Sequence, residues 1–131
     1  MACLDTNFII DFIKGKIDIE EVNQLGEFIS ISSPSIVEII RGLHLKKTLQ
    51  HIKQNEEEKI ENTLNSLNIL QLNKESAKIA GRLQAELINK GEDIGIIDIL
   101  IAAIALRNNE TLITRNKKHF EKIPNLKIQT Y

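Results

Sequence analysis

Short aliphatic runs alternate with longer helical patterns along the whole chain, and this alternation constrains the fold more than any other feature. Runs suited to strands buried on both faces occur at residues 2–4, 28–32, 69–72, 111–113 and 126–128. The stretches between these runs have helical periodicity. Strands joined through helices pair in parallel, because each crossover returns the chain to the same end of the sheet. The sequence therefore predicts an α/β domain of three layers, in which helices flank a small parallel sheet.

Capping residues mark where several of the helices begin and end. Ser33 precedes Pro34, a residue favoured in a first helical turn, and Asn73 is an expected N-cap. Gly91 and the pair at 108–109 are typical of helix ends. A further helix is expected near residues 17–27. These signals do not determine the order of the strands within the sheet.

Length and composition exclude several classes of protein. The 131 residues correspond to one domain, expected over residues 1–131. The 17 Lys and Arg residues nearly balance the 18 Asp and Glu residues. This near-neutral net charge excludes a protein that coats nucleic acid and a polybasic membrane binder. The single cysteine, Cys3, excludes an intramolecular disulfide and a cysteine-based zinc site. The absence of a long apolar run and of a signal-peptide pattern predicts a cytoplasmic protein with no membrane partner.

Two acidic residues lie at or just after predicted helix starts, which is where open parallel sheets form their sites. Asp5 directly follows the first strand. An N-cap is the alternative role for Asp5, because aspartate before an apolar helical run accepts N–H bonds of the first turn. Glu38 lies on the polar side of the helix that follows Pro34. A solvated glutamate paired with Arg41 three residues on is the alternative role for Glu38.

Asp98 interrupts an apolar helix over residues 96–106. An ionised carboxylate in such a buried helix must cap, pair with a cation or bind a metal, because an unpaired buried charge is costly. Capping is an open alternative, given Gly95 just upstream. Asn116 follows the strand at 111–113, where it is either a turn residue or an oxygen ligand of a hard cation.

The three acids together predict a divalent cation site. Carboxylates that converge at one sheet edge repel one another and favour protonation unless a cation is present. Oxygen ligands without cysteine select Mg²⁺ or Mn²⁺ over zinc. A magnesium ion held by a few carboxylates in an open cleft suits the hydrolysis of phosphodiesters.

Basic residues gather in two stretches, residues 44–53 and 115–122. They form a local basic rim that can neutralise a few phosphates around an acidic centre. The three histidines, His44, His51 and His119, are expected at the surface or against phosphates rather than as metal ligands.

Four blocks of the sequence, in this order and spacing, resemble the VapC-type PIN-domain ribonuclease toxins, and a closing block fits the same family. The blocks are residues 4–11 (LDTNFIID), 33–43 (SPSIVEIIRGL), 94–103 (IGIIDILIAA), 112–120 (LITRNKKHF) and 123–128 (IPNLKI). The resemblance spans the chain and implies a three-layer PIN-like domain over residues 1–131.

The resemblance also implies a function: a Mg²⁺- or Mn²⁺-dependent endoribonuclease, the toxin of a toxin–antitoxin pair. By this resemblance Asp5 and Asp98 bind metal, and Glu38 completes the catalytic acids. The supporting residues are Thr6, Asn7, Thr114 and Asn116, and the residues expected to contact RNA are Arg115, Lys117 and Lys118. The implied partners are a VapB-type antitoxin, an RNA substrate and a second copy of the chain in a homodimer.

One departure from the family and two rival functions accompany this interpretation. Many PIN domains have a fourth acid near Asn116, so its neutral side chain predicts one firm metal site, at Asp5 and Asp98, and a second that fills mainly when substrate is bound. The first rival is a PIN-fold binding module that regulates without cleaving. The second is a receiver-like phosphoacceptor domain, which the sequence disfavours because Asn7 stands where a second acid is needed after the first strand.

Overall fold

The computed structural model describes residues 1–45 and 54–131 and contains one parallel sheet of five strands. The strand order is β3-β2-β1-β4-β5, and neighbouring strands all pair in parallel. The strands are β1 (Ala2–Leu4), β2 (Ile29–Ser32), β3 (Asn68–Leu70), β4 (Thr111–Ile113) and β5 (Ile128–Gln129). The predicted parallel sheet is therefore confirmed.

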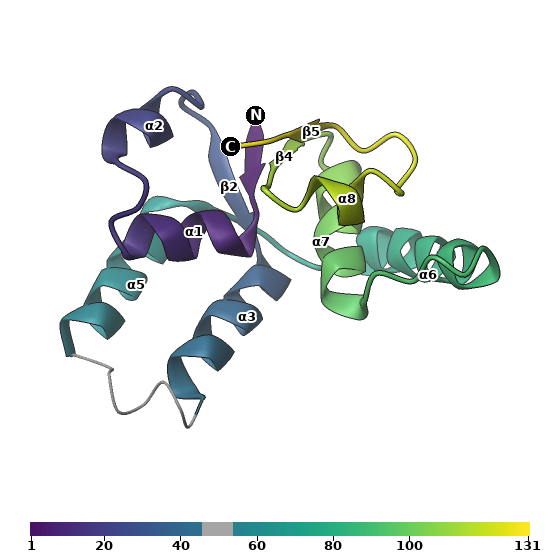
Figure 1. Cartoon of the computed structure of the whole chain (residues 1–131), viewed down its shortest axis with the longest axis horizontal. Helices are drawn as coiled ribbons and strands as arrows, with labels where there is room; N and C mark the ends of the chain where they lie inside the picture. Colours follow the sequence, from purple (N-terminus) through teal and green to yellow (C-terminus); the bar gives the residue numbers. More distant parts are fainter. Residues whose placement is uncertain (46–53) are drawn as a thin grey trace.

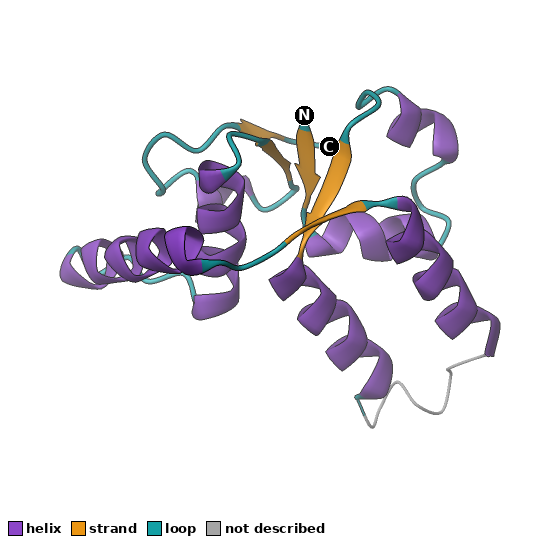
Figure 2. Ribbon diagram, turned by 180° about the vertical axis from the view of Figure 1, so that it is seen from behind, coloured by secondary structure: helices purple, strands orange, loops and turns teal. Residues whose placement is uncertain are grey.

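The described helices lie on both faces of this sheet, which gives the three predicted layers (Figures 1 and 2). In Figure 1, α1, α3 and α5 lie on one side of the sheet, and α6 and α7 lie on the other. The helices are α1 (Thr6–Ile13), α2 (Ile19–Asn23), α3 (Ser33–His44), α5 (Gln54–Ser66), α6 (Lys74–Asn89), α7 (Ile96–Arg107) and α8 (Lys117–Phe120).

Alternate strand residues face the two halves of the core. Leu4, Ile31 and Ile113 pack with the core on the side of α1, α3 and α5. Cys3 and Leu112 face the opposite core, with α6 and α7. Because successive strand side chains point to opposite faces, a strand buried on both faces carries apolar or small side chains, as in β1, and in β2 with its buried Ser30 and Ser32.

The apolar helix α7 lies between the sheet and α6, so it is enclosed on nearly all sides. Five consecutive residues of α7, Ile101–Ala105, are fully buried. Burial on both sides explains why this helix has no polar stripe. Of the residues that the structure describes, none belongs to a helix long and apolar enough to cross a membrane.

Several predicted boundaries were wrong by a few residues. The strand expected at 28–32 begins at Ile29, since the Phe28 side chain is 70% exposed. The strand expected at 69–72 ends at Leu70, and the last strand begins only at Ile128, beyond a turn at Asn125 with a φ of 67°. The helix expected at 17–27 covers only Ile19–Asn23.

The capping signals were accurate at Asn73 and Gly91, whereas α3 has Ser32 rather than Ser33 as its N-cap and has no side-chain capping hydrogen bond. Asn73 caps α6 through a capping box with Ser76, and its Oδ1 accepts a hydrogen bond from the Ser76 N–H at 2.9 Å. Gly91, just after α6, has a φ of 70°, the left-handed conformation that ends many helices. Of the basic stretch expected at 44–53, residues 46–53 lie outside the described part of the chain.

Glu110 is a buried acid between α7 and β4, away from the carboxylates considered above. Its side chain accepts a hydrogen bond from the Ser30 hydroxyl at 3.1 Å. Its second oxygen, Oε2, has no hydrogen-bond partner among the described residues. Burial raises the pKa of Glu110, and the bond from Ser30 only partly offsets this.

We predict that Glu110→Gln stabilises the protein at neutral and basic pH. Because the folded state binds this proton more tightly, the carboxyl stabilises the fold below its unfolded pKa of about 4.3. That stabilisation is lost as pH rises through the raised folded pKa. Urea unfolding at pH 8 should show a gain on the order of 1 kcal/mol for the variant. The gain should vanish below pH 4, and the exposed control Glu86→Gln should show no gain at either pH.

Candidate active site

A polar pocket of about 340 Å³ lies at the carboxyl edge of the sheet. It is bounded by α1, α3, the first turn of α7 and the loop after β4, four segments far apart in the sequence. The three predicted catalytic acids, Asp5, Glu38 and Asp98, all line this pocket. Its other lining residues are Thr6, Asn7, Ile10, Arg41, Gly42, Leu45 and Asn116.

Asp5 is both the N-cap of α1 and part of the pocket, so capping does not keep its side chain out of the site. Its Oδ1 accepts a hydrogen bond from the Thr6 N–H at 2.8 Å. Its Oδ2 accepts one from the Thr114 hydroxyl at 2.6 Å. Burial raises the pKa of Asp5; the bonds from Thr114 and Thr6 oppose this rise, and the charges of Asp98 and Glu38 add to it.

Glu38 is not the freely solvated glutamate of the alternative interpretation. Its Oε1 accepts a hydrogen bond from the Thr6 hydroxyl at 2.6 Å, which turns the carboxylate toward α1. The expected pair with Arg41 also exists, but Nη2 lies 3.9 Å from Oε2 and the Arg41 side chain is 61% exposed. Such an exposed ion pair contributes little to stability. Thr6 therefore joins two of the acids, Asp5 through its backbone and Glu38 through its hydroxyl.

Asp98 lies in the first turn of α7, where Gly95 is the N-cap. Within the described chain the Asp98 side chain accepts no hydrogen bond from a backbone N–H, so the capping alternative is not supported. Its Oδ2 instead lies 3.1 Å from His119 Nδ1. The first turn is also more open than predicted for a buried helix, since Ile96 is 50% exposed.

His119 is the residue of this site that sequence reasoning missed. Its side chain is about half exposed, as expected of a surface histidine, yet its Nδ1 lies 2.9 Å from Asn116 Nδ2 and 3.1 Å from Asp98. When Nδ1 carries the proton, it donates a hydrogen bond to Asp98. In the other tautomer, Nδ1 accepts a hydrogen bond from the Asn116 amide. The sequence did contain one signal of this contact: His119 lies three residues after Asn116, the N-cap of α8, so the two side chains are neighbours.

Thr114 is fully buried and connects the loop after β4 to Asp5. Its hydroxyl oxygen also accepts a hydrogen bond from the Asn116 N–H at 2.9 Å. Thr114 thus supports the site from behind, while Thr6, Asn7 and Asn116 line it. All four predicted supporting residues therefore lie at or directly behind the pocket.

The three residues expected to contact RNA differ in their surroundings. Arg115 donates from Nη1 to Asp11 Oδ2 at 2.8 Å, while its side chain stays 52% exposed. The Tyr131 hydroxyl donates to the same oxygen at 3.3 Å. Arg115 thereby ties the loop after β4 to α1. Lys117 and Lys118 are exposed on α8.

The donor set of this pocket fits a hard cation with few protein ligands. No three His, Cys, Asp or Glu side chains in residues 1–45 and 54–131 gather tightly enough to form a ready-made metal centre. Three carboxylates nevertheless share one pocket with the side chain of Asn116. Mg²⁺ binds through one or two carboxylates and retains several waters, whereas structural zinc needs a closed set of four ligands. The arrangement is therefore compatible with Mg²⁺ or Mn²⁺.

Comparison with known proteins identifies a family for this chain. The model of the family described as "PIN domain" matches residues 2–126. A ribonuclease VapC2 of Rickettsia felis is 35% identical over 103 residues, 79% of this chain and 74% of the relative. A tRNA(fMet)-specific endonuclease VapC of Salmonella typhimurium is 31% identical over 98% of this chain and 96% of the relative.

A solved structure has the same fold. It is the complex VapBC2 of Rickettsia felis bound to a DNA fragment from its promoter. The matching chain has a TM-score of 0.84 and 32% identity, and the match covers 99% of this chain and 98% of that chain.

We predict that Thr114→Val destabilises the fold and that Thr114→Ser does so far less. Valine keeps the volume but removes the hydroxyl, which leaves the buried Asp5 carboxylate short of a donor and the Asn116 N–H short of an acceptor. The loss should be roughly 1–3 kcal/mol in urea unfolding at pH 7. Equal stability of the two variants would show that these hydrogen bonds do not support the pocket.

Proposed function

The chain belongs to the PIN-domain family and to its VapC group, and from this premise we propose that it is a metal-dependent endoribonuclease. In this proposal residues 1–131 form one PIN domain that acts as the toxin of a toxin–antitoxin pair. The observation that carries the proposal is the convergence of Asp5, Glu38 and Asp98, from three distant segments, on one pocket.

Asp5 and Asp98 hold Mg²⁺ or Mn²⁺ in this proposal, and Glu38 completes the acidic cluster. Bound there, the ion would polarise a phosphoryl oxygen of the substrate and lower the pKa of a coordinated water. Thr114 and the Thr6 N–H hold Asp5 by donating to both of its oxygens, which favours its ionised form. The pocket thus offers anionic oxygens that are already oriented.

Glu38 is the residue that we assign to the attacking water. Its Oε1 is held by the Thr6 hydroxyl, so Oε2 is the oxygen that can accept a hydrogen bond from water and then its proton. His119 orients Asp98 from the opposite side, in the way that outer hydrogen bonds orient metal-binding carboxylates. The proposed products are a 5′-phosphate and a 3′-hydroxyl.

The substrate and partners are inferred from the relatives. The names of the relatives in Rickettsia felis and Salmonella typhimurium describe a ribonuclease and an endonuclease specific for tRNA(fMet), which supports RNA as the substrate class. Solved neighbours from the same two organisms are VapBC complexes, which supports a VapB-type antitoxin as the partner. We also propose a homodimer, as the family resemblance implies.

Cleavage of RNA by the purified protein tests this function. With Mn²⁺ present the protein should cut single-stranded RNA, and EDTA should abolish the cutting. Asp98→Asn should lower the cleavage rate at least about a hundredfold, because it removes a charge from the ion's ligand while changing little volume. Calorimetric titration should show a parallel loss of Mn²⁺ affinity.

A matched substitution elsewhere controls for the change of charge. Asp18 caps α2 through a hydrogen bond from the Glu21 N–H, and asparagine caps equally well. Asp18→Asn should therefore cleave like the parent protein. A folded parent that binds Mn²⁺ but cuts no RNA would favour the non-cleaving binding module.

We predict that Lys117→Ala combined with Lys118→Ala weakens RNA binding through a loss of phosphate contacts. The slope of log affinity against log salt should fall by roughly 1–2, while Mn²⁺ affinity stays constant. Fluorescence anisotropy in the Asp98→Asn background measures binding without cleavage. Lys78→Ala with Lys90→Ala, two exposed lysines at α6, is the control. An unchanged slope in the α8 variant would place the RNA on another surface.

A further inference from the structure

A buried carboxylate on α1, that of Asp11, joins three segments of the chain. The Asp11 side chain is only 6% exposed. Its Oδ2 accepts a hydrogen bond from Arg115 Nη1 at 2.8 Å and another from the Tyr131 hydroxyl at 3.3 Å. Arg115 belongs to the loop after β4, and Tyr131 follows β5. These three residues form what we call the Asp11 cluster.

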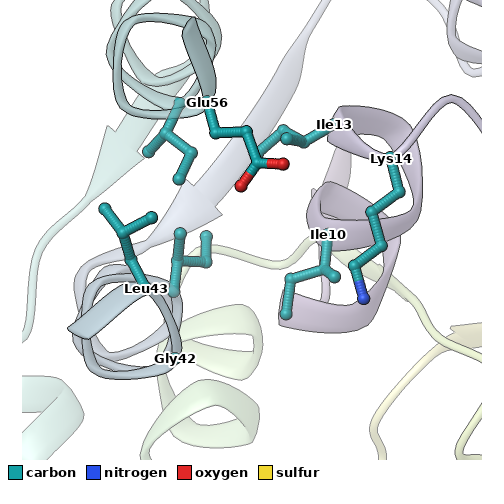
Figure 3. Close-up of a pocket in the computed structure, with 8 residues that line it drawn as sticks. Ile10, Ile13, Lys14, Gly42, Leu43 and Glu56 are labelled. Atoms are coloured by element: carbon teal, nitrogen blue, oxygen red, sulfur yellow. The ribbon is translucent and has the colours of Figure 1, made fainter. Parts of the chain in front are cut away.

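The Asp11 cluster borders the carboxylate pocket. Arg115 directly precedes Asn116, which lines that pocket. Asp11 lies one helical turn after Asn7, another lining residue, so these two side chains are neighbours on one side of α1. A different side of α1 lines a separate aliphatic pocket with α3 and α5 (Figure 3). The cluster is therefore reached from the carboxylate pocket on the side of Asn7 and Asn116.

The arginine of the cluster is fixed by a buried partner and yet open to solvent. The Arg115 side chain is 52% exposed. A guanidinium has several N–H donors, and among the described residues Arg115 donates only to Asp11. Its other donors can therefore bind a ligand without breaking the bond to Asp11. Because the side chain is already held, less conformational entropy is lost when such a ligand binds.

The tyrosine of the cluster is held in the same way. Its hydroxyl donates to Asp11, and its ring contacts the ring of Phe8 edge to face, with 5.0 Å between the ring centroids. Burial raises the pKa of Tyr131, and the charge of Asp11 adds to that rise, so the hydroxyl stays protonated and remains a donor. Tyr131 is nevertheless 42% exposed. Part of the fixed ring is thus accessible.

A fixed arginine beside a fixed aromatic ring matches one nucleotide of single-stranded RNA. A guanidinium binds phosphate oxygens through parallel N–H bonds. An aromatic side chain offers a surface on which a base of any sequence can stack. Phe28, another exposed aromatic residue of the described chain, precedes β2 and so lies at the opposite edge of the sheet. At the edge that carries the three acids, Tyr131 supplies the exposed ring.

We propose that Arg115 and Tyr131 form a subsite for one nucleotide of the RNA strand next to the carboxylate pocket, in which Arg115 binds the phosphate and Tyr131 stacks on the base. Asp11 is the positioning residue of this subsite, because it holds both side chains and contacts no RNA itself. This proposal rests on the proposed ribonuclease function and adds to it a determinant of how the substrate is held.

Replacement of Asp11 separates positioning from charge. Asp11→Ala removes a negative charge beside the RNA, which by electrostatics alone would tighten binding. The proposal predicts the opposite result. Affinity for single-stranded RNA, measured by fluorescence anisotropy in the Asp98→Asn background, should fall about tenfold because the stacking and the phosphate contact both loosen. With Asp98 intact, KM should rise while kcat changes little.

An exposed acid near the same loop provides the matched control. Glu121 lies at the end of α8, outside the cluster and the carboxylate pocket. Glu121→Ala removes the same charge as Asp11→Ala and should bind RNA as tightly as the parent protein or more tightly. Mn²⁺ affinity should equal that of the parent in both variants, because neither change touches Asp5 or Asp98.

Modified RNAs test the two contacts separately and do not depend on the folding of Asp11→Ala. An abasic nucleotide moved along a short RNA should weaken binding to the parent most at one position. Tyr131→Ala should abolish this dependence on position, whereas Tyr131→Phe, which retains the ring, should keep it. An uncharged methylphosphonate linkage should also weaken binding to the parent most at one position, and Arg115→Gln should remove that response.

The outcomes distinguish this subsite from the function on which it rests. A parent protein that cuts no RNA would refute the proposed function itself. A parent that cuts, with undiminished RNA affinity in Asp11→Ala and the parent's abasic profile in Tyr131→Ala, would refute the subsite alone. Variants that lose only affinity for a VapB-type antitoxin would assign the cluster to a protein partner and overturn the proposal.

Discussion

The confinement of three carboxylates to one partly buried pocket is the constraint on which the rest of this site depends. Asp5, Glu38 and Asp98 line this pocket; burial raises the pKa of Asp5, and the charges of Asp98 and Glu38 add to that rise. Thr6 and Thr114 donate hydrogen bonds to Asp5 and Glu38, and His119 Nδ1 lies 3.1 Å from Asp98, so each carboxyl group is held in place. The protein thus accepts an electrostatic cost where a divalent cation would relieve it.

The same hydrogen bonds join elements that are distant in the sequence. Thr114 connects the loop after β4 to the start of α1, and Arg115 connects that loop to Asp11 farther along α1. Thr6 connects α1 to α3. Stability and site geometry are therefore coupled at the carboxyl edge of the sheet, so the loss of one buried donor affects both.

The class of fold and most strands could be predicted because both follow from local patterns. Aliphatic runs such as 2–4 and 111–113 must be buried on both faces, and the capping residue Asn73 reports a helix start directly. The ends of the strands were less predictable, because they depend on which residues become exposed in the folded protein. Phe28 looked like a strand residue but is exposed, and a turn at Asn125 delays the last strand. His119 was expected at the surface or against phosphates, and its contact with Asp98 could not be predicted because it joins residues 21 positions apart.

By itself the sequence determined a parallel α/β layer structure and the acids at its edge, since hydrophobic periodicity and caps act over a few residues. Only the tertiary structure decided the strand order β3-β2-β1-β4-β5 and the pocket that the three acids share. The physical reason is that these features depend on how helices pack across the sheet. Packing joins segments that no local pattern relates, and it determines whether an acid such as Glu38 faces water or a neighbouring hydroxyl.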